Sequence, residues 1–134
     1  MQVLPSTASS PPINIREILK SVDNNVHAGV KYMRYLIDNY FAREQMDSLN
    51  KHLFALAAYN AGPGNVRKLR REAIEKGMNP NEWFNSVEIL AAHHIGAEPI
   101  QYVSNIYKYY RAYQALQMYK DLREKSRSLQ KETQ

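Results

Sequence analysis

Few side chains in this sequence belong to the types that perform covalent or metal chemistry. No cysteine occurs among the 134 residues, which excludes disulfides and thiolate–metal sites. The adjacent histidines His93 and His94 look like a metal motif, but neighbouring residues of a helix point about 100° apart and cannot share one ion. We therefore expect neither a metal site nor a cofactor.

The acidic residues do not form a pattern typical of a catalytic acid. Glu98 precedes Pro99 at an expected helix start, where the helix dipole favours a carboxylate. Four further acids are interpreted as solvated or capping residues: Glu72, Glu75, Glu82 and Glu88. The remaining candidates are tyrosines and the turn at 59–64, Tyr-Asn-Ala-Gly-Pro-Gly, which taken alone fits an ordinary helix end.

The chain is basic, with 18 Lys and Arg against 13 Asp and Glu, a net charge of +5. Such a balance suits an anionic cell-wall polymer, nucleic acid or an anionic membrane surface, or simply solvated helix faces. The basic residues are spread out apart from residues 67–71, Arg-Lys-Leu-Arg-Arg. No apolar run is long enough to span a bilayer, and the N-terminus lacks the basic and apolar regions of a secretory signal. We expect any export signal to lie outside this chain.

Apolar residues recur at steps of three and four, which predicts an all-α protein of one domain. The predicted helices cover about 24–41, 48–59, 63–77, 86–93 and the stretch from 98 onward, with a short one near 83–84. Residues 1–14, rich in Pro, Ser and Thr, are predicted to be a loop. We expect the domain to cover 1–120, followed by a polar tail or helix extension over 121–134.

The periodicity also predicts which side chains face the core. On the first long helix these are Val26, Val30, Met33, Leu36 or Ile37, and Tyr40. On the last helix they are Val103, Ile106, Tyr110, Tyr113 and Leu116 or Gln117. The tyrosines of this helix are expected to form core and groove wall: Tyr107, Tyr109, Tyr110, Tyr113 and Tyr119. An aromatic, basic helix of this kind would alternatively stack nucleic acid bases.

Three short segments stand in an informative order. Residues 1–8 read Met-Gln-Val-Leu-Pro-Ser-Thr-Ala, residues 57–66 read Ala-Ala-Tyr-Asn-Ala-Gly-Pro-Gly-Asn-Val, and residues 98–103 read Glu-Pro-Ile-Gln-Tyr-Val. Together they resemble the soluble lytic transglycosylases, whose fold is similar to goose-type lysozyme. Residues 25–32 fit the helix that follows the first motif in that family. Pro99 departs from the family's Thr at that position, although Pro is welcome at a helix start.

This resemblance implies an all-α, lysozyme-like helical domain of a peptidoglycan lytic transglycosylase. Family members cleave the β-1,4 bond between N-acetylmuramic acid and N-acetylglucosamine without water and give 1,6-anhydromuramyl products. The resemblance implies substrate-binding roles for five residues: Gln2, Tyr59, Asn60, Gly62 and Tyr102. The partner would be peptidoglycan glycan strands and not nucleic acid, and the location would be the periplasm or cell envelope.

The resemblance places the catalytic glutamate, in a Glu-Ser segment, upstream of Met1. We therefore expect no catalytic residue within these 134 and no activity of the chain alone. Without the glutamate-bearing helix, apolar side chains such as Val30, Leu53 and Leu56 would be exposed, so we expect self-association or a complementing segment at that face. A catalytically dead glycan-binding or assembly module of the cell envelope is the alternative, and a basic helical nucleic-acid binder is a weaker one.

Overall fold

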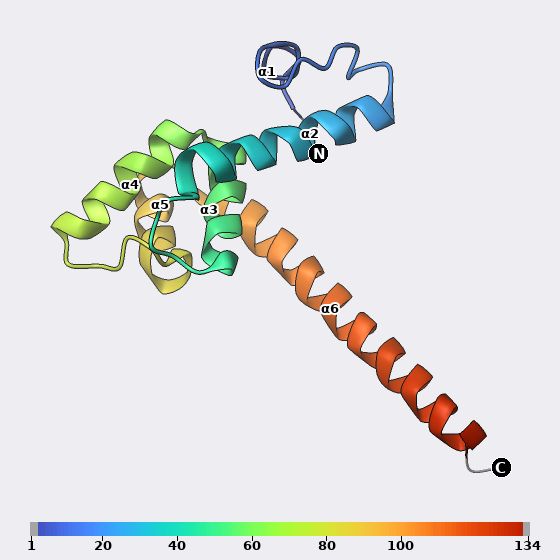
Figure 1. The fold of residues 1–134 in the computed structure, drawn as a ribbon. Helices are drawn as coiled ribbons and strands as arrows, with labels where there is room; N and C mark the ends of the chain where they lie inside the picture. The colour runs from blue at the N-terminus through green and yellow to red at the C-terminus, as the bar shows by residue number, and fades with distance from the viewer. Residues whose placement is uncertain (1–2, 133–134) are drawn as a thin grey trace. The chain divides into compact units, whose positions relative to one another are not determined.

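Helices form the regular structure of the protein in the computed structural model, which describes residues 3–132 (Figure 1). The elements in chain order are α1 (Pro5–Ser9), α2 (Val22–Leu36), the π-helix η1 (Ile37–Phe41), α3 (Ser48–Ala61), α4 (Pro63–Glu75), the irregular π-helical turn η2 (Trp83–Val87), α5 (Glu88–His94) and α6 (Ala97–Glu132). No strand occurs within residues 3–132. The predicted all-α class is therefore confirmed.

The helix ends are set by local hydrogen bonds. The Ser21 hydroxyl accepts from the Asn24 backbone N–H (3.2 Å) at the start of α2, and the Asp47 carboxylate accepts from the Asn50 N–H (2.6 Å) at the start of α3. Gly62 separates α3 from α4 with φ 88° and ψ 141°, a backbone conformation that is essentially restricted to glycine. Pro63 then begins α4 as predicted, because its fixed φ suits a first helical residue.

Two local predictions are wrong. Residues 5–9, expected in a loop, form α1, in which Pro5 starts the helix and Ala8 is buried. The short helix expected near 83–84 is not regular, because Phe84 is extended (ψ 138°) and Asn85 has φ 57°. Because residues 1–14 are rich in turn-forming residue types, their composition predicted a loop. The burial of Ala8 stabilises the helix that forms there instead.

Two groups of buried side chains hold the helices together. The first, Val3, Ala8, Ile13, Ile18 and Ala28, packs the N-terminal segment onto α2. The Lys31 ammonium of α2 also donates to the Ile13 carbonyl (2.8 Å). The second is an aromatic series of Phe41, Phe54 and Trp83, with ring centroids 5.9 and 5.6 Å apart, which joins η1, α3 and η2. Helix α3 contacts α2, η1 and α4 and is central to this part of the fold (Figure 1).

Helix α2 does not bury the face that its periodicity predicts. Leu36 is buried as expected, but Val30 is 56% exposed and Val26 46% exposed. Besides Leu36, the buried residues are the small Ala28 and Gly29, and the N-terminal segment packs against Ala28. An exposed stripe of Val22, Val26 and Val30, which we call the α2 valine stripe, remains on the surface.

The apolar surface that we expected to be exposed without the glutamate-bearing helix is therefore only partly as predicted. Leu53, expected to be exposed, is only 2% exposed because α3 is central to the fold, and Leu56 is partly buried. The exposed apolar surface lies on α2 instead.

The chain divides into two compact units, the first ending at Tyr102 and the second beginning at Val103. Within the second unit, whose described residues are the part of α6 from Val103 onward, Tyr109, Tyr110, Tyr113 and Tyr119 are exposed, so their expected place in a core is wrong. A single helix has no partner within its own unit to cover them. Helix α6 continues to Glu132, and the domain limit at residue 120 stays a prediction. No helix within residues 3–132 is both long and apolar enough to cross a membrane.

Candidate functional site

A pocket of about 780 Å³ lies in the first unit. The C-terminal end of α3 supplies Tyr59 and Asn60, α2 supplies Tyr32, and the first turns of α6 supply Glu98 and Tyr102. The remaining lining residues are Val3, Leu4, Thr7, Ala58, Ala61 and Gly62. We call this the Tyr59 pocket. Its volume lies in the usual range of about 300–1,000 Å³ for small-molecule sites.

Three tyrosine rings from three helices meet in the Tyr59 pocket. The Tyr59 and Tyr102 rings are stacked, with centroids 6.4 Å apart and planes 6° apart. The Tyr32 ring lies 5.4 Å from the Tyr59 ring at an angle of 50°. Such a group offers apolar ring surface together with hydroxyl groups, a combination that suits a ligand with both apolar faces and polar edges.

The Tyr59 hydroxyl is buried and has no hydrogen-bond partner among the described residues. A buried polar group left unpaired costs about 1–3 kcal/mol, so a ligand or another segment that supplies an acceptor would gain from pairing with it. Burial, followed by the neighbouring Tyr102 and Tyr32, raises the pKa of Tyr59 to about 12. The Tyr59 hydroxyl therefore keeps its proton at neutral pH and is available as a donor.

The neighbouring tyrosines are also held in their protonated form. Burial raises the pKa of Tyr102. Burial raises the pKa of Tyr32 as well, with smaller contributions from Tyr40 and Tyr35. The Tyr59 pocket thus presents neutral phenols, which are hydrogen-bond donors and not bases.

Four of the five site residues predicted from the sequence come together here. Tyr59, Asn60, Gly62 and Tyr102 all line the Tyr59 pocket. A Cβ atom at Gly62 would meet nothing within 4 Å, so the turn is open on that side. Gln2, the fifth predicted residue, lies outside the described residues, although the adjacent Val3 lines the pocket.

Tyr32, Thr7 and Glu98 are among the lining residues that were not predicted as site residues from the sequence. Tyr32 lies four residues after Ala28 on the buried side of α2, and Thr7 lies on α1, which was expected to be a loop. Glu98 was interpreted only as a helix-start residue, yet its exposed side chain also lines the pocket. Its position one turn before Tyr102 on α6 was the available signal.

The described residues contain no group of three or more His, Cys, Asp or Glu side chains that could hold a metal ion. His94 is engaged instead by Glu72, at 3.0 Å from its Nε2 atom.

Comparison with known protein families gives a match to the transglycosylase SLT domain over residues 1–84. The chain belongs to the SLT-domain transglycosylase family. The matched residues include the N-terminal motif, α2 and the turn that carries Tyr59, Asn60 and Gly62. The matched range ends before Glu98 and Tyr102. These two residues are therefore placed in the pocket by the structure and not by the family match.

Similar proteins are named membrane-bound lytic murein transglycosylase F. The chain is 31% identical over 99 residues to the one from Pseudomonas fluorescens (64% of this chain, 20% of that protein). It is 33% identical over 101 residues to the one from Desulfosudis oleivorans (66% and 22%) and 27% identical over 125 residues to the one from Shewanella woodyi (84% and 26%). The chain thus spans about a fifth to a quarter of the length of these SLT-domain relatives. No solved structure matches the chain.

Proposed function

We propose that this chain forms the substrate-binding part of a peptidoglycan lytic transglycosylase, with the Tyr59 pocket as its sugar site. The observation that carries the proposal is the buried, unpaired Tyr59 hydroxyl between the rings of Tyr32 and Tyr102. An N-acetylated sugar offers both an apolar face for the rings and a carbonyl acceptor for the hydroxyl. The family membership supports the same substrate class.

The reaction needs one carboxylic acid and no water. The acid protonates the glycosidic oxygen as the bond from that oxygen to the anomeric carbon of N-acetylmuramic acid breaks. The resulting carboxylate then takes the proton of the muramyl 6-hydroxyl, whose oxygen forms the new bond to the anomeric carbon. The acid is regenerated and the product is a 1,6-anhydro sugar.

We place this acid on a segment upstream of residue 1, next to Tyr59. In that position the neutral phenol would donate a hydrogen bond to the carboxylate or to the substrate's N-acetyl carbonyl. Asn60 and Gln2 would bind sugar substituents through their amides. Tyr102 would pack its ring on a sugar face, and the open turn at Gly62 would let backbone approach the glycan.

The chain alone is predicted to release no anhydromuropeptides from purified sacculi above a buffer blank, as measured by mass spectrometry. General acid–base help is worth about 10²–10⁴-fold, and no described residue of the pocket replaces the acid, because Glu98 is exposed. A fusion that adds the glutamate-bearing segment of a lytic relative upstream of residue 1 should be active. In that fusion Tyr59→Phe should lower activity and the exposed Tyr113→Phe should not.

Two outcomes would count against the proposal. Release of anhydromuropeptides by the chain alone would show that the acid lies within these 134 residues. A fusion that stays inactive while the chain still sediments with sacculi would favour a glycan-binding module without catalysis.

We also propose that the chain works in the cell envelope, where peptidoglycan is found, as the membrane-bound relatives suggest.

The α2 valine stripe is proposed as a surface for a second copy of the chain. The upstream segment is the competing occupant of that surface.

A further inference from the structure

A second pocket is lined by the residue that follows the α3–α4 turn of the Tyr59 pocket. Gly62 lines the Tyr59 pocket, and the next residue, Pro63, lines a pocket of about 470 Å³. Its other lining residues come from η1, the loop after it, and α4: Asp38, Asn39, Tyr40, Phe41, Arg43, Glu44, Arg67 and Arg70. We call it the Arg67 pocket.

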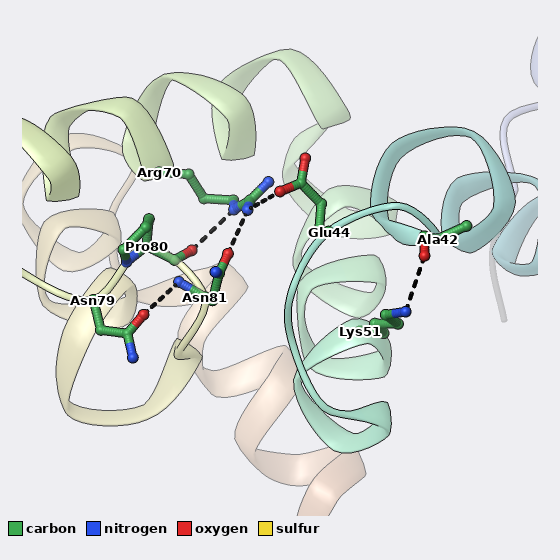
Figure 2. A network of polar contacts seen from close by, with 7 residues as sticks. All are labelled: Ala42, Glu44, Lys51, Arg70, Asn79, Pro80 and Asn81. Carbon is green, nitrogen blue, oxygen red and sulfur yellow. Dashed lines mark hydrogen bonds and ion pairs between the residues drawn. The ribbon is translucent and has the colours of Figure 1, made fainter.

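One arginine of this pocket is already in use. The Arg70 guanidinium donates to the Glu44 carboxylate (2.7 Å), the Asn81 side chain (2.7 Å) and the Pro80 carbonyl (2.9 Å), as Figure 2 shows. It also lies over the Phe54 ring, 5.5 Å from its centroid. Arg70 therefore holds the wall of the pocket together, and its charge is balanced by Glu44.

The other two arginines leave the pocket positively charged. The second acid, Asp38, is paired with Arg34 outside the pocket (2.8 Å). Arg43 and Arg67 have no carboxylate within salt-bridge distance among the described residues, and both are exposed. The start of α4 at Pro63 adds the positive end of a helix dipole. An anion is the ligand that this arrangement would bind.

A row of aromatic rings joins the two pockets. From Tyr59 it continues to Tyr32 at 5.4 Å, to Tyr35 at 6.3 Å and to Tyr40 at 6.3 Å. The Arg67 guanidinium then lies over the Tyr40 ring, 5.6 Å from its centroid, which orients the charge and leaves its N–H groups free to donate. The Arg67 guanidinium is thus linked to Tyr59 by a chain of ring contacts through Tyr32, Tyr35 and Tyr40.

We propose that the Arg67 pocket binds a carboxylate of the peptide stem carried by the muramyl residues of the strand. This rests on the proposed function, since it takes the Tyr59 pocket as the sugar site. In a stem-bearing strand the lactyl group of each muramyl residue is an amide, so the carboxylates lie on the stems, whereas an uncharged chitin-like polymer has none. A guanidinium pairs with a carboxylate through two parallel hydrogen bonds, so Arg43 and Arg67 select stem-bearing strands.

The test measures the affinity of the full chain for glycan fragments with intact stems and for a stem-free form, chitin oligomers with the same number of sugars, which carry neither stems nor lactyl carboxylates. We expect the wild type to bind the stem-bearing form about tenfold more tightly or better, as one charge-assisted pair would give. The double variant Arg43→Gln/Arg67→Gln should lose that preference and bind the stem-free form like the wild type. The unchanged stem-free binding also shows that the variant is folded.

The matched control is Lys68→Gln/Arg71→Gln, which removes two exposed positive charges from α4 outside both pockets. This variant should keep the preference for stems. Equal loss in the control would mean general charge attraction and would overturn the inference, as would a wild type that binds both forms equally well. In both cases the sugar site stands. Binding of neither form by the wild type would overturn the proposed function and the inference together.

Discussion

At the scale of single residues, Tyr59 places an unpaired hydroxyl group at a pocket. Its hydroxyl is buried, yet it has no partner among the described residues. Its ring is held between Tyr32 and Tyr102, so the hydroxyl cannot turn to solvent without losing both ring contacts. The unpaired donor is therefore maintained by the packing around it.

The first prediction concerns the alkaline titration of Tyr59. Because its pKa is raised from 10.0 to about 12, the folded chain holds this proton more tightly than the unfolded chain does. The contribution of this proton to the free energy of unfolding is fully present below pH 10 and is lost as the pH rises towards 12. Urea unfolding across this range should show the loss, and Tyr59→Phe should reduce it. An identical decline in both proteins would contradict the assignment.

The second prediction uses the two glycines of the turn after Tyr59. A Cβ atom at Gly62 or Gly64 would meet nothing within 4 Å, so the two sites are matched in space, but only Gly62 has a positive φ of 88°. Gly62→Ala should lower the free energy of unfolding by about 1–3 kcal/mol through backbone strain alone. Gly64→Ala, inside the first turn of α4, should be neutral or stabilising by up to about 1 kcal/mol. Denaturant unfolding measures both, and equal effects would refute the strain argument.

At the scale of the elements, the Tyr59 pocket is made by helix ends and the Arg67 pocket by an irregular helix. The π-helix η1 extends α2 by one wider turn and brings Asp38, Tyr40 and Phe41 to the wall of the Arg67 pocket. Arg70 of α4 then fixes that wall by binding Glu44 and the loop at Pro80 and Asn81 (Figure 2). One side chain thus connects three segments that are distant in the sequence.

The third prediction compares this arginine with an exposed one. The Arg70 side chain is 14% exposed and makes three charge-assisted hydrogen bonds, so Arg70→Met should lower the free energy of unfolding by about 2–3 kcal/mol. Arg34→Met removes an exposed pair with Asp38 and should change it by less than about 0.5 kcal/mol. Thermal and urea unfolding would both show the difference. A loss for Arg34→Met as large as that for Arg70→Met would be the contrary result.

At the scale of the whole molecule, the chain presents apolar surface that a stable monomer would normally cover. The α2 valine stripe is the clearest example in the first unit, and the second unit carries exposed apolar and aromatic side chains along α6, including Tyr113, Leu116 and Leu122. Burial of apolar surface is worth about 25 cal/mol per Å², so covering a few hundred Å² would stabilise the chain by several kcal/mol. That is a large part of the stability of a small domain.

The fourth prediction is that the 134-residue chain self-associates through the α2 valine stripe. Light scattering over a range of concentrations should show the mean mass rising with concentration. Val26→Glu/Val30→Glu should shift the chain towards the monomer, whereas Ile74→Glu, at an equally exposed apolar residue of α4, should not. A fusion with the glutamate-bearing segment that becomes monomeric would show that this segment is the true occupant. A wild-type monomer that is unaffected by dilution and melts cooperatively would refute the prediction.

Much of this protein follows from short-range properties of its sequence. The helix period, the Pro and Gly around residues 62–63 and the order of the motifs predicted the all-α class, the start of α4 and the family. They also named Tyr59, Asn60, Gly62 and Tyr102, which line one pocket. These predictions succeed because helical periodicity and turn conformation depend on residues a few positions apart.

The rest depended on contacts between residues far apart in the chain. Periodicity could not tell which side of α2 faces inward, because both sides carry apolar residues. The small Ala28 and Gly29 are buried, and the N-terminal segment packs against Ala28. The unpaired state of the Tyr59 hydroxyl, the place of Glu98 in the Tyr59 pocket and the charge balance of the Arg67 pocket each require partners brought together by folding. The residue types are local information, but whether a donor is paired or a charge is balanced is decided only when the helices pack.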